Sequence, residues 1–505
     1  MASASEPASR TRSALLAAAA ALGSGVCAYL GTGLHPIAPL TWFALLPVLL
    51  LAPRVRWGWA AGAAAVAWIA GQSGLWSYFA GPLRMPLPVL IGVLALYPQL
   101  AAGSTVLFRA LVRRNRPISA MLAVPVVWVA GEYLISVSQP HGAWLSLGYT
   151  QADVRPVLQV AAVTGVWGVT FLITWFPAAI AALAAPGASG RRLRVIGTAA
   201  VILTVSSGYW GVRLLAPQTG PTIRVAVLGG PIDAELGPDT ADGQAQLTTY
   251  QQQIGRYADA GASVVVLPEK VFDTDERTWP MLADPLAKLA AERHVTIVVG
   301  ATVRQGGTAT NVAVAFPATG GAAVTYTKHH LIPGLESDLT EGDGPPVVLP
   351  GGLGLIVCKD LDFPGLVRQD RNADASILLA PAWDMGSDGW LHGRMAIVRG
   401  IESGTSVARA GRNGLLTISD PTGDVVAEAD AVHDPDTAIV ADVPTGTGRT
   451  LYALIGDWFA WLCTAATVLL ALLAARKGRS APRNVPLDAA DRPGNPSMTV
   501  NSATV

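Results

Sequence analysis

The sequence predicts a bundle of about eight membrane helices joined to a water-exposed α/β domain, on three observations. The 505-residue chain is 51% hydrophobic and only 14% charged, with a mean hydropathy of +0.41, which is typical of chains that meet lipid. Acidic residues are nearly absent from 13–215, where only Glu132 and Asp153 occur, whereas 222–445 has the polar mixture of a soluble domain. In that second part, short β-branched runs alternate with helical patterns.

Eight apolar runs are long enough, or nearly long enough, to cross a bilayer, which takes about 20 residues. They lie at 13–33, 37–52, 57–80, 86–111, 118–136, 157–185, 193–215 and 453–475. The run at 37–52 falls short of that length. The first run follows Arg10 and Arg12 as a signal peptide would, but six further runs come after it before residue 216, so we expect a retained helix.

Basic residues are shared unequally between the loops. If the N-terminus is cytoplasmic, the inner loops hold Arg10, Arg12, Arg54, Arg56, Arg109, Arg113, Arg114, Arg116, Arg191, Arg192, Arg194, Arg476, Lys477 and Arg479. The short outer loops hold only Arg84 and Arg155. This asymmetry follows the positive-inside rule, so seven crossings are expected to leave the next domain outside the cytoplasm.

The expected organisation therefore has five parts. It comprises a cytoplasmic N-terminus at 1–12, a seven-helix membrane domain at 13–215, an extracytoplasmic domain at 216–452, an eighth helix at 453–475 and a cytoplasmic tail at 476–505. The tail is rich in Pro, Asn, Ser and Asp without periodicity, so we expect it to be disordered.

Strands in the outer domain are predicted by nearly continuous apolar runs, as in sheets that are covered on both faces. These runs lie at 222–229, 262–269, 295–301, 354–358 and 375–382. Helical patterns at 246–261 and 285–294 lie between them. Paired strands joined by Gly-containing turns are predicted later, at 310–316, 322–328, 414–420 and 423–429.

Three of the predicted strands end in ionisable residues. Glu269 follows Pro268 at the end of one strand, Lys328 ends another with Glu336 beyond a turn, and Cys358 ends a third. If these strands are neighbours in one sheet, their ends place a carboxylate, an ammonium and a thiol in the crevice where open α/β sheets bind ligands. The alternative is that Glu269 and Lys328 are exposed charges at strand ends.

Together the three groups fit nucleophilic catalysis. Glu269 can take the proton of Cys358, and Lys328 with a backbone N–H after the cysteine can stabilise an oxyanion. Cys27 and Cys463 lie in apolar runs, so Cys358 is the only cysteine of the polar domain. Because the net charge is zero and the seven histidines are scattered, we expect neither a nucleic-acid partner nor a cofactor or metal site.

The turn that follows Cys358 is strongly charged. Lys359, added to Lys328, is expected to favour the thiolate form of the cysteine. The other interpretation is that Lys359 pairs with Asp360 or Asp362 at the surface.

Two further expectations concern segments around the site. Arg394, Arg399 and Glu402 are expected to form structural salt bridges, since the last two are three residues apart on a helix. The segments 271–280 and 335–345 are candidate membrane-facing lids, because aromatic side chains favour the bilayer interface, and ordinary packed loops are the alternative. These segments carry Phe272, Trp279 and Leu335.

Glu269, Lys328 and Cys358, in this order and at strand ends, resemble the Glu–Lys–Cys triad of the nitrilase (carbon–nitrogen hydrolase) superfamily. That resemblance implies an α-β-β-α sandwich. The segments 141–173, 328–337 and 392–426 resemble parts of the bacterial apolipoprotein N-acyltransferases. Eight helices, with the catalytic domain between the seventh and the eighth, are also the layout of that family.

The resemblance implies a role for each residue. Glu269 would be the general base, Lys328 the oxyanion stabiliser and Cys358 the acyl-accepting nucleophile, while Glu336 matches a further glutamate that those enzymes need. A fatty acyl chain would pass from a phospholipid to the cysteine as a thioester, and then to the N-terminal amine of a diacylglyceryl-cysteine lipoprotein. The implied location is the bacterial inner membrane.

The sequence departs from the family pattern at three places. Leu267 replaces a Trp before Pro-Glu, Gly334-Leu335 replace Phe-Gly, and Lys359-Asp360 stand where Tyr-Glu is usual. Asp360 keeps the charge on a shorter stem, whereas Lys359 exchanges an aromatic for a cation. The alternative function is a membrane-anchored nitrilase-like amidase that hydrolyses a C–N bond, although an anchor needs only one helix.

Overall fold

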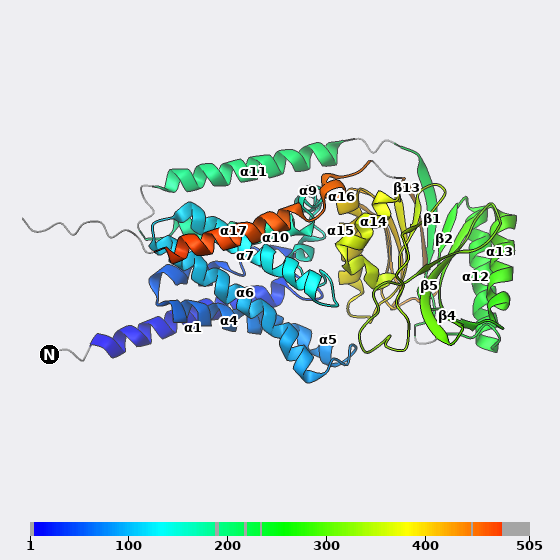
Figure 1. Ribbon diagram of the computed structural model, residues 1–505, viewed down its shortest axis with the longest axis horizontal. Coiled ribbons are helices and arrows are strands. Elements are labelled where there is room, and N and C mark those ends of the chain that lie inside the picture. Colours follow the sequence, from blue (N-terminus) through cyan, green and yellow to red (C-terminus); the bar gives the residue numbers. More distant parts are fainter. Residues whose placement is uncertain (1–4, 187–190, 217–219, 233–234, 446–447, 477–505) are drawn as a thin grey trace, which may run out of the picture.

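The computed structural model describes residues 5–186, 191–216, 220–232, 235–445 and 448–476. Figure 1 shows an elongated molecule with a helical bundle at one end and a domain of two sheets at the other. The last helix, α17 (Trp458–Ala475), runs back along the bundle, so helices from both ends of the chain share it. The tail predicted at 476–505 lies outside the described residues, apart from Arg476.

Six helices in the described ranges are long and apolar enough to cross a membrane. They are α1 (Ser5–Gly31), α6 (Leu87–Arg113), α7 (Pro117–Ser138), α10 (Val166–Leu183), α11 (Arg192–Leu215) and α17. The expected number of about eight includes two regions that fold as shorter apolar pieces. These pieces are α2 (Ala38–Thr41), α3 (Leu46–Leu51), α4 (Trp57–Gln72) and α5 (Trp76–Ala80).

The run predicted at 157–185 is not one helix, which corrects the hydropathy reading. It contains parts of α8 (Arg155–Leu158) and α9 (Ala161–Thr164) before α10 begins at Val166. Gly165 separates α9 from α10 with φ +70°, a left-handed conformation that suits glycine. A Cβ there would also lie 2.6 Å from the ring of Tyr452. Hydropathy does not register such a break, because the flanking residues are apolar.

The second domain contains two sheets. The first has the order β13-β1-β2-β4-β5-β6, with β3 paired to β4, and the second has the order β12-β11-β10-β9-β8-β7. The strands of the first are β1 (Thr222–Leu228), β2 (Val264–Val266), β3 (Phe272–Asp275), β4 (Thr296–Gln305), β5 (Thr308–Phe316), β6 (Val324–Thr327) and β13 (Ala438–Pro444). Those of the second are β7 (Val347–Leu349), β8 (Leu353–Leu355), β9 (Ile377–Trp383), β10 (Ser406–Arg412), β11 (Leu415–Ser419) and β12 (Val425–Asp430).

Helices cover both outer faces, which confirms the α-β-β-α sandwich. Helices α12 (Ala241–Asp259) and α13 (Trp279–Arg293) cover the first sheet, at the end of the molecule away from the bundle (Figure 1). Helices α14 (Pro364–Asn372) and α15 (Gly389–Ser403) lie between the second sheet and the bundle. The apolar side chains of α15 belong to the core of the bundle: Leu391, Met395, Ile397, Val398 and Ile401. The two domains therefore share a hydrophobic core.

The segment at 271–280 is not a membrane-facing lid. Phe272 lies in β3 and is fully buried in the core under α12 and α13. Trp279 begins α13 and stacks on Phe316, with 6.5 Å between the ring centroids. Because α13 lies at the far end from the bundle, the prediction for this segment is wrong. Its aromatic side chains pack in the core between the first sheet and helices α12 and α13.

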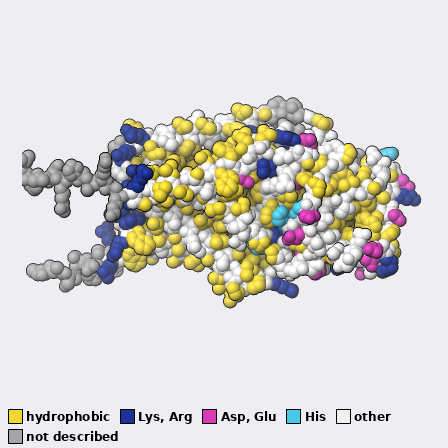
Figure 2. Space-filling model, viewed as in Figure 1, with side chains coloured by type: hydrophobic (Ala, Val, Ile, Leu, Met, Phe, Trp, Pro, Cys, Tyr) yellow, Lys and Arg dark blue, Asp and Glu magenta, His cyan; other side chains and the backbone are white. Residues whose placement is uncertain are grey.

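The arginine-rich loops gather at one end of the bundle. Figure 2 shows the basic side chains concentrated at the end remote from the sheet domain. Arg109 Nε donates to the Val55 carbonyl at 2.9 Å, and Arg54 donates to that of Ala184 at 3.1 Å. Loops that the positive-inside argument assigned to one side thus contact one another.

Candidate active site

Glu269 is fixed where the two sheets meet. It follows β2, and its backbone N–H donates to the carbonyl of Ala382 in β9 of the other sheet at 3.4 Å. Gly300 of β4 lies directly against this turn, since a Cβ there would be 2.4 Å from the Pro268 carbonyl oxygen. The Glu269 side chain is only 2% exposed. Glu269 is therefore an interior carboxylate rather than an exposed charge.

Lys328 bridges two carboxylates in the interior. Its Nζ donates to Glu269 Oε1 at 2.8 Å and to Glu336 Oε2 at 2.8 Å, and its side chain is fully buried. Asn311 Nδ2 donates to the remaining Glu336 oxygen at 2.8 Å and to Glu269 Oε1 at 2.6 Å. The backbone N–H of Ile332 donates to Glu336 Oε2 at 2.8 Å. These bonds fix the ammonium and both carboxylates relative to one another.

The charges of this cluster stabilise one another against burial. Burial opposes the charge of Lys328, but the carboxylates of Glu269 and Glu336 outweigh it and raise the pKa of the amine well above its usual value. Burial likewise opposes ionisation of Glu336, but Lys328 and the bonds from Ile332 and Asn311 lower the pKa of that carboxyl. Lys328 therefore stays a cation in a dry site, as an oxyanion stabiliser must.

Cys358 stands at a strained turn that follows β8. It begins a 3₁₀ turn, η5 (Cys358–Asp362), with φ +41°, a conformation that non-glycine residues seldom adopt. Its Sγ lies 3.7 Å from the carbonyl oxygen of Trp383, and the side chain is 6% exposed. Glu269 and Lys328 both act on its charge, so the thiol, the carboxylate and the ammonium lie in one site.

The three groups do not come from neighbouring strands of one sheet, which corrects the sequence expectation. Glu269 and Lys328 follow β2 and β6 of the first sheet, with β4 and β5 between those strands. Cys358 follows β8 of the second sheet. The site is formed because the strand ends of two facing sheets meet, so the packing of the sandwich assembles it.

The expectation of a thiolate is also wrong. Burial, reinforced by the Glu269 carboxylate, raises the pKa of Cys358 well above its usual value, and Lys328 and Arg409 offset this only in part. A base must therefore remove the proton before the sulfur can attack. Within the described part of the chain, Glu269 Oε2 is buried and accepts no hydrogen bond, so this oxygen is free to take it.

Lys359 and Asp360 form neither arrangement predicted for them. Lys359 is 7% exposed, and its Nζ donates to the carbonyl of Leu331 at 2.7 Å. Asp360 is fully buried and accepts bonds from the backbone N–H of His330 at 2.9 Å and from the Tyr326 hydroxyl at 2.8 Å. Both residues tie the turn after the cysteine to the segment that follows Lys328.

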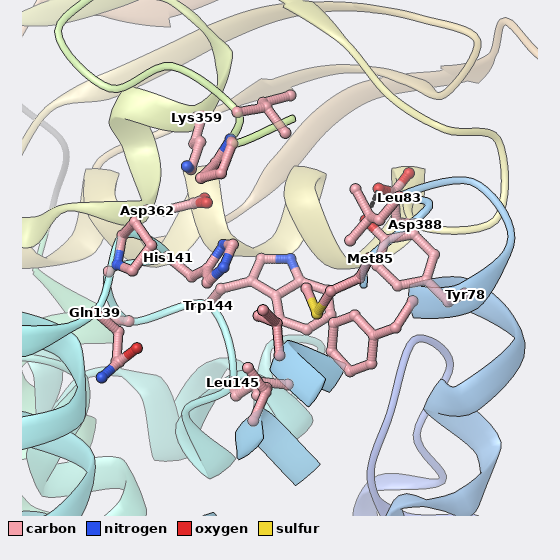
Figure 3. A pocket seen from close by; sticks show the side chains of 18 of the residues that line it. Tyr78, Leu83, Met85, Gln139, His141, Trp144, Leu145, Lys359, Asp362 and Asp388 are labelled. Carbon is pink, nitrogen blue, oxygen red and sulfur yellow. Dashed lines mark hydrogen bonds between the residues drawn. The ribbon is translucent and has the colours of Figure 1, made fainter. Parts of the chain in front are cut away.

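A cavity of about 410 Å³ leads from the bundle to Cys358. Its walls in the membrane domain are mostly apolar, and they include Phe79, Leu83, Met85, Val89, Val93, Leu96 and Ile135. Figure 3 shows Lys359, Asp362 and His141 on one side of the cavity and Tyr78, Leu83 and Met85 on the other. The second predicted lid segment, 335–345, supplies no residue to the cavity lining, whereas Ile332, Pro333 and Gly334, just before it, do line the cavity.

Contacts next to the cavity dock the membrane helices onto the catalytic domain. The Tyr78 hydroxyl donates to Asp388 Oδ2 at 2.5 Å, and Trp144 Nε1 donates to His392 Nε2 at 3.0 Å. Asp384, Asp388 and His392 lie close enough together to hold an ion, but Asp384 forms an ion pair with Arg409. Each of these side chains therefore has a protein partner, and together they form the surface on which the membrane helices dock.

Several residues of the site escaped the sequence analysis. Asn311 had a usable signal, because an amide inside the apolar strand 310–316 must find buried partners. His141 and Trp144 had none, since they reach the site from a loop of the membrane domain. Asp362 was considered only as a surface partner of Lys359, yet it is 4% exposed and lines the cavity.

Comparison with known proteins gives matches over both parts of the chain. The model of the apolipoprotein N-acyltransferase N-terminal domain matches residues 24–183, and the carbon–nitrogen hydrolase model matches residues 224–456. An apolipoprotein N-acyltransferase of Geobacter metallireducens is 28% identical over 90% of this chain and 94% of its own length. One of Gloeobacter violaceus is 29% identical over 95% of this chain and 98% of its own length.

Among solved structures, an amidase from Nesterenkonia sp. resembles 48% of this chain and 97% of its own length, with 22% identity and a TM-score of 0.40. The first model covers the bundle as far as α10 and the second covers the sandwich, and the relatives extend across both. The chain therefore joins an apolipoprotein N-acyltransferase N-terminal domain to a carbon–nitrogen hydrolase domain, and it is similar to apolipoprotein N-acyltransferases across both.

Proposed function

We propose that this protein moves a fatty acyl chain from a phospholipid, through a thioester on Cys358, to the N-terminal amine of a diacylglyceryl-cysteine lipoprotein. The observation that carries the proposal is the cavity that joins the apolar interior of the bundle to the thiol. A small amide would not need such a cavity, whereas an acyl chain requires an apolar wall along its length.

The wall supplied by α6 has the dimensions of a chain-binding groove. Val89, Val93 and Leu96 lie on one face of this helix at spacings of four and three residues. At a rise of 1.5 Å per residue, they line about 10 Å of the cavity. A donor chain can therefore lie along α6 with its ester carbonyl near Cys358.

In the first half-reaction, Glu269 takes the proton of the Cys358 thiol and the sulfur attacks the ester carbonyl. The oxyanion that forms faces the ammonium of Lys328 and the backbone N–H of Lys359, which lies in the first turn of η5 and has no intrahelical acceptor. The ester C–O bond then breaks, and Glu269 returns its proton to the departing lysophospholipid alkoxide. The acyl chain is left as a thioester.

In the second half-reaction, the amine of the lipoprotein attacks the thioester carbonyl. The C–N bond forms, the C–S bond breaks, and the sulfur leaves as a thiolate that regains a proton. The same donors stabilise the oxyanion. Glu336 supports both steps, because it orients Lys328 through a bond of 2.8 Å.

The proposed location is the bacterial inner membrane, with the catalytic domain 216–452 outside the cytoplasm. The arginine-rich end of the bundle would face the cytoplasm under the positive-inside rule, and the sheet domain lies at the opposite end. The N-terminus at 1–12 and the tail at 476–505 would then be cytoplasmic. This arrangement puts the mouth of the cavity at the outer leaflet, where diacylglyceryl anchors lie.

Purified protein in detergent can be tested with a phospholipid and a diacylglyceryl-cysteinyl peptide. We expect N-acylated peptide and lysophospholipid in equal amounts, together with a hydroxylamine-sensitive acyl-enzyme when the peptide is omitted. Cys358→Ala should form none of these products, and Cys358→Ser should lose most activity because a hydroxyl is far less acidic than a thiol. Release of ammonia from simple amides, without acylated peptide, would support the amidase alternative instead.

A further inference from the structure

Asp362 is a buried carboxylate that faces the cavity and has no partner among the residues that the structure describes. Its side chain is 4% exposed and lines the same cavity as Cys358 (Figure 3). Nothing in the described part of the chain donates a hydrogen bond or lies within ion-pair distance of this carboxylate. Buried carboxylates normally have such partners, because an unpaired charge is costly away from water. The side chain is therefore available to a ligand.

The backbone of Asp362 is fixed by the membrane domain. Its carbonyl accepts a bond from the backbone N–H of Ala143 at 2.8 Å. Gly142 packs so closely there that a Cβ would lie 2.5 Å from the same carbonyl oxygen. Asp362 is four residues beyond Cys358 on η5, about 8 Å along a 3₁₀ turn. Both residues line the one cavity, so the carboxylate borders the space next to the sulfur.

Charged and titratable groups surround Asp362 from several elements. They are Lys359 on its own turn, His392 and Arg399 on α15, Lys328 after β6, Tyr78 on α5, Tyr149 before α8, and His141 on the same side of the cavity. Burial raises the pKa of Asp362 to about 6, although the positive charges of His392, Lys359 and Arg399 oppose the shift. The carboxylate is thus ionised at neutral pH, but it is a stronger base than an ordinary aspartate.

We propose that Asp362 binds the α-ammonium of the incoming lipoprotein and accepts one of its protons before the amine attacks the thioester. This inference rests on the proposed function and names the residue that prepares the acceptor. An α-amine has a pKa of about 7.7–8.0, so at neutral pH most of it is ammonium and carries no lone pair. A carboxylate facing that ammonium in a dry cavity both holds it and removes the proton.

The proton balance requires a second base besides Glu269. An ammonium that becomes an amide loses two protons, while the departing thiolate takes up only one. The first passes from the ammonium to Asp362, and solvent receives it when the product leaves. The second leaves the attacking nitrogen for Glu269 Oε2, which passes it to the Cys358 sulfur as the C–S bond breaks. Each base then returns to its starting state.

The test is Asp362→Asn, which preserves shape and removes the basic oxygen. We expect lysophospholipid release in a single turnover without acceptor to remain as in the wild type. Transfer to a diacylglyceryl-cysteinyl peptide should fall about 100-fold at pH 7, within the usual contribution of a general base. In the wild type, the rate of transfer should rise with pH up to about pH 6 and then stay constant. In the variant, the rate should keep rising up to about pH 8, where the amine loses its own proton.

Asp370→Asn is the matched control, because Asp370 is also a buried carboxylate without a described partner but lies on α14, away from the cavity. It should leave both half-reactions unchanged. The inference is overturned if Asp362→Asn transfers as fast as the wild type at pH 7, or if it slows acylation and transfer equally. A wild-type protein that forms no acyl-enzyme would instead contradict the proposed function.

Discussion

Cys358 is a thiol that the fold keeps protonated and pairs with a base. Its strained φ of +41° points the residue out of the second sheet toward groups from the first. Burial and Glu269 both raise the pKa of the thiol. In the proposed mechanism, the same carboxylate that disfavours the thiolate at rest removes the proton when the sulfur attacks the ester carbonyl.

This dual action of Glu269 gives the first prediction. Glu269→Gln should abolish formation of the acyl-enzyme, because no base remains for the thiol. The same variant should lower the pKa of Cys358, because it removes the negative charge that raises it. The pH dependence of alkylation of this cysteine by iodoacetamide, followed by mass spectrometry, measures the pKa. Lysophospholipid release measures the acylation.

Asn311 offers a control for Glu269→Gln. From β5, its Nδ2 donates to Glu269 Oε1 at 2.6 Å, but Asn311 is not itself a base. Asn311→Ala should slow acylation less than Glu269→Gln and should leave the thiol pKa raised. If Glu269→Gln alkylates only at higher pH than the wild type, the assignment of the raised pKa to this carboxylate is wrong.

At the scale of elements, α15 joins the two domains. Arg399 forms a 2.6 Å ion pair with Glu402 on the same helix, and Arg399 also donates to the Tyr149 hydroxyl at 2.6 Å. Glu402 Oε1 accepts the backbone N–H of Val166, the first residue of α10, at 2.6 Å. The predicted structural salt bridge is thus present, and it caps a membrane helix.

Breaking this pair should loosen the junction between the domains. Arg399→Met leaves the Glu402 carboxylate buried without its cation, which costs about 3–5 kcal/mol in such pairs. Burial already raises the pKa of Glu402 to about 7, and loss of the arginine raises it further. A carboxyl whose pKa is raised on folding destabilises as pH rises, so the deficit in melting temperature should grow between about pH 5 and pH 8.

Glu402→Gln completes a double-mutant cycle with Arg399→Met. Glutamine still accepts the Val166 N–H but carries no charge. The double variant should be more stable than the sum of the single losses predicts, and its melting temperature should vary less with pH than that of Arg399→Met. Additive losses without a pH trend would show that the pair contributes little beyond packing. Thermal unfolding in detergent, followed by intrinsic fluorescence, measures all of these variants.

At the scale of the whole molecule, the two ends differ in charge and in fold. The arginine loops occupy one end and the sandwich the other. The prediction is that the sandwich lies outside the cytoplasm. In intact cells, a Gln305→Cys reporter in a Cys358→Ala background should react with a membrane-impermeant maleimide, since residue 305 is exposed at the end of β4.

The opposite reporter is Asn115→Cys, in the exposed loop between α6 and α7 at the arginine-rich end. It should react only after the cells are lysed. If the Gln305 reporter required lysis and the Asn115 reporter did not, the molecule would be inverted. The parent Cys358→Ala protein serves as the blank, because Cys27 and Cys463 lie in membrane helices.

The fold class followed from local patterns, because hydropathy and strand periodicity are properties of adjacent residues. Apolar runs gave the bundle, continuous β-branched runs gave strands such as β1 and β9, and the order of Glu269, Lys328 and Cys358 gave the family resemblance. The same patterns predicted one helix at 157–185, although Gly165 ends a helix inside that apolar run. They also placed Trp279 in a membrane-facing lid, although it packs on the ring of Phe316.

Only the tertiary structure decided how the site is built and how its groups ionise. The cysteine comes from one sheet and its charged partners from the other, and the cavity wall comes from membrane helices more than 200 residues earlier in the chain. The pKa of a side chain depends on burial and on charges brought close by folding, so the identity of Lys359 or Asp362 could not reveal it. The sequence by itself determined which chemical groups are present and the pattern of the elements. Long-range packing decided which groups meet, which stay dry and which face the substrate.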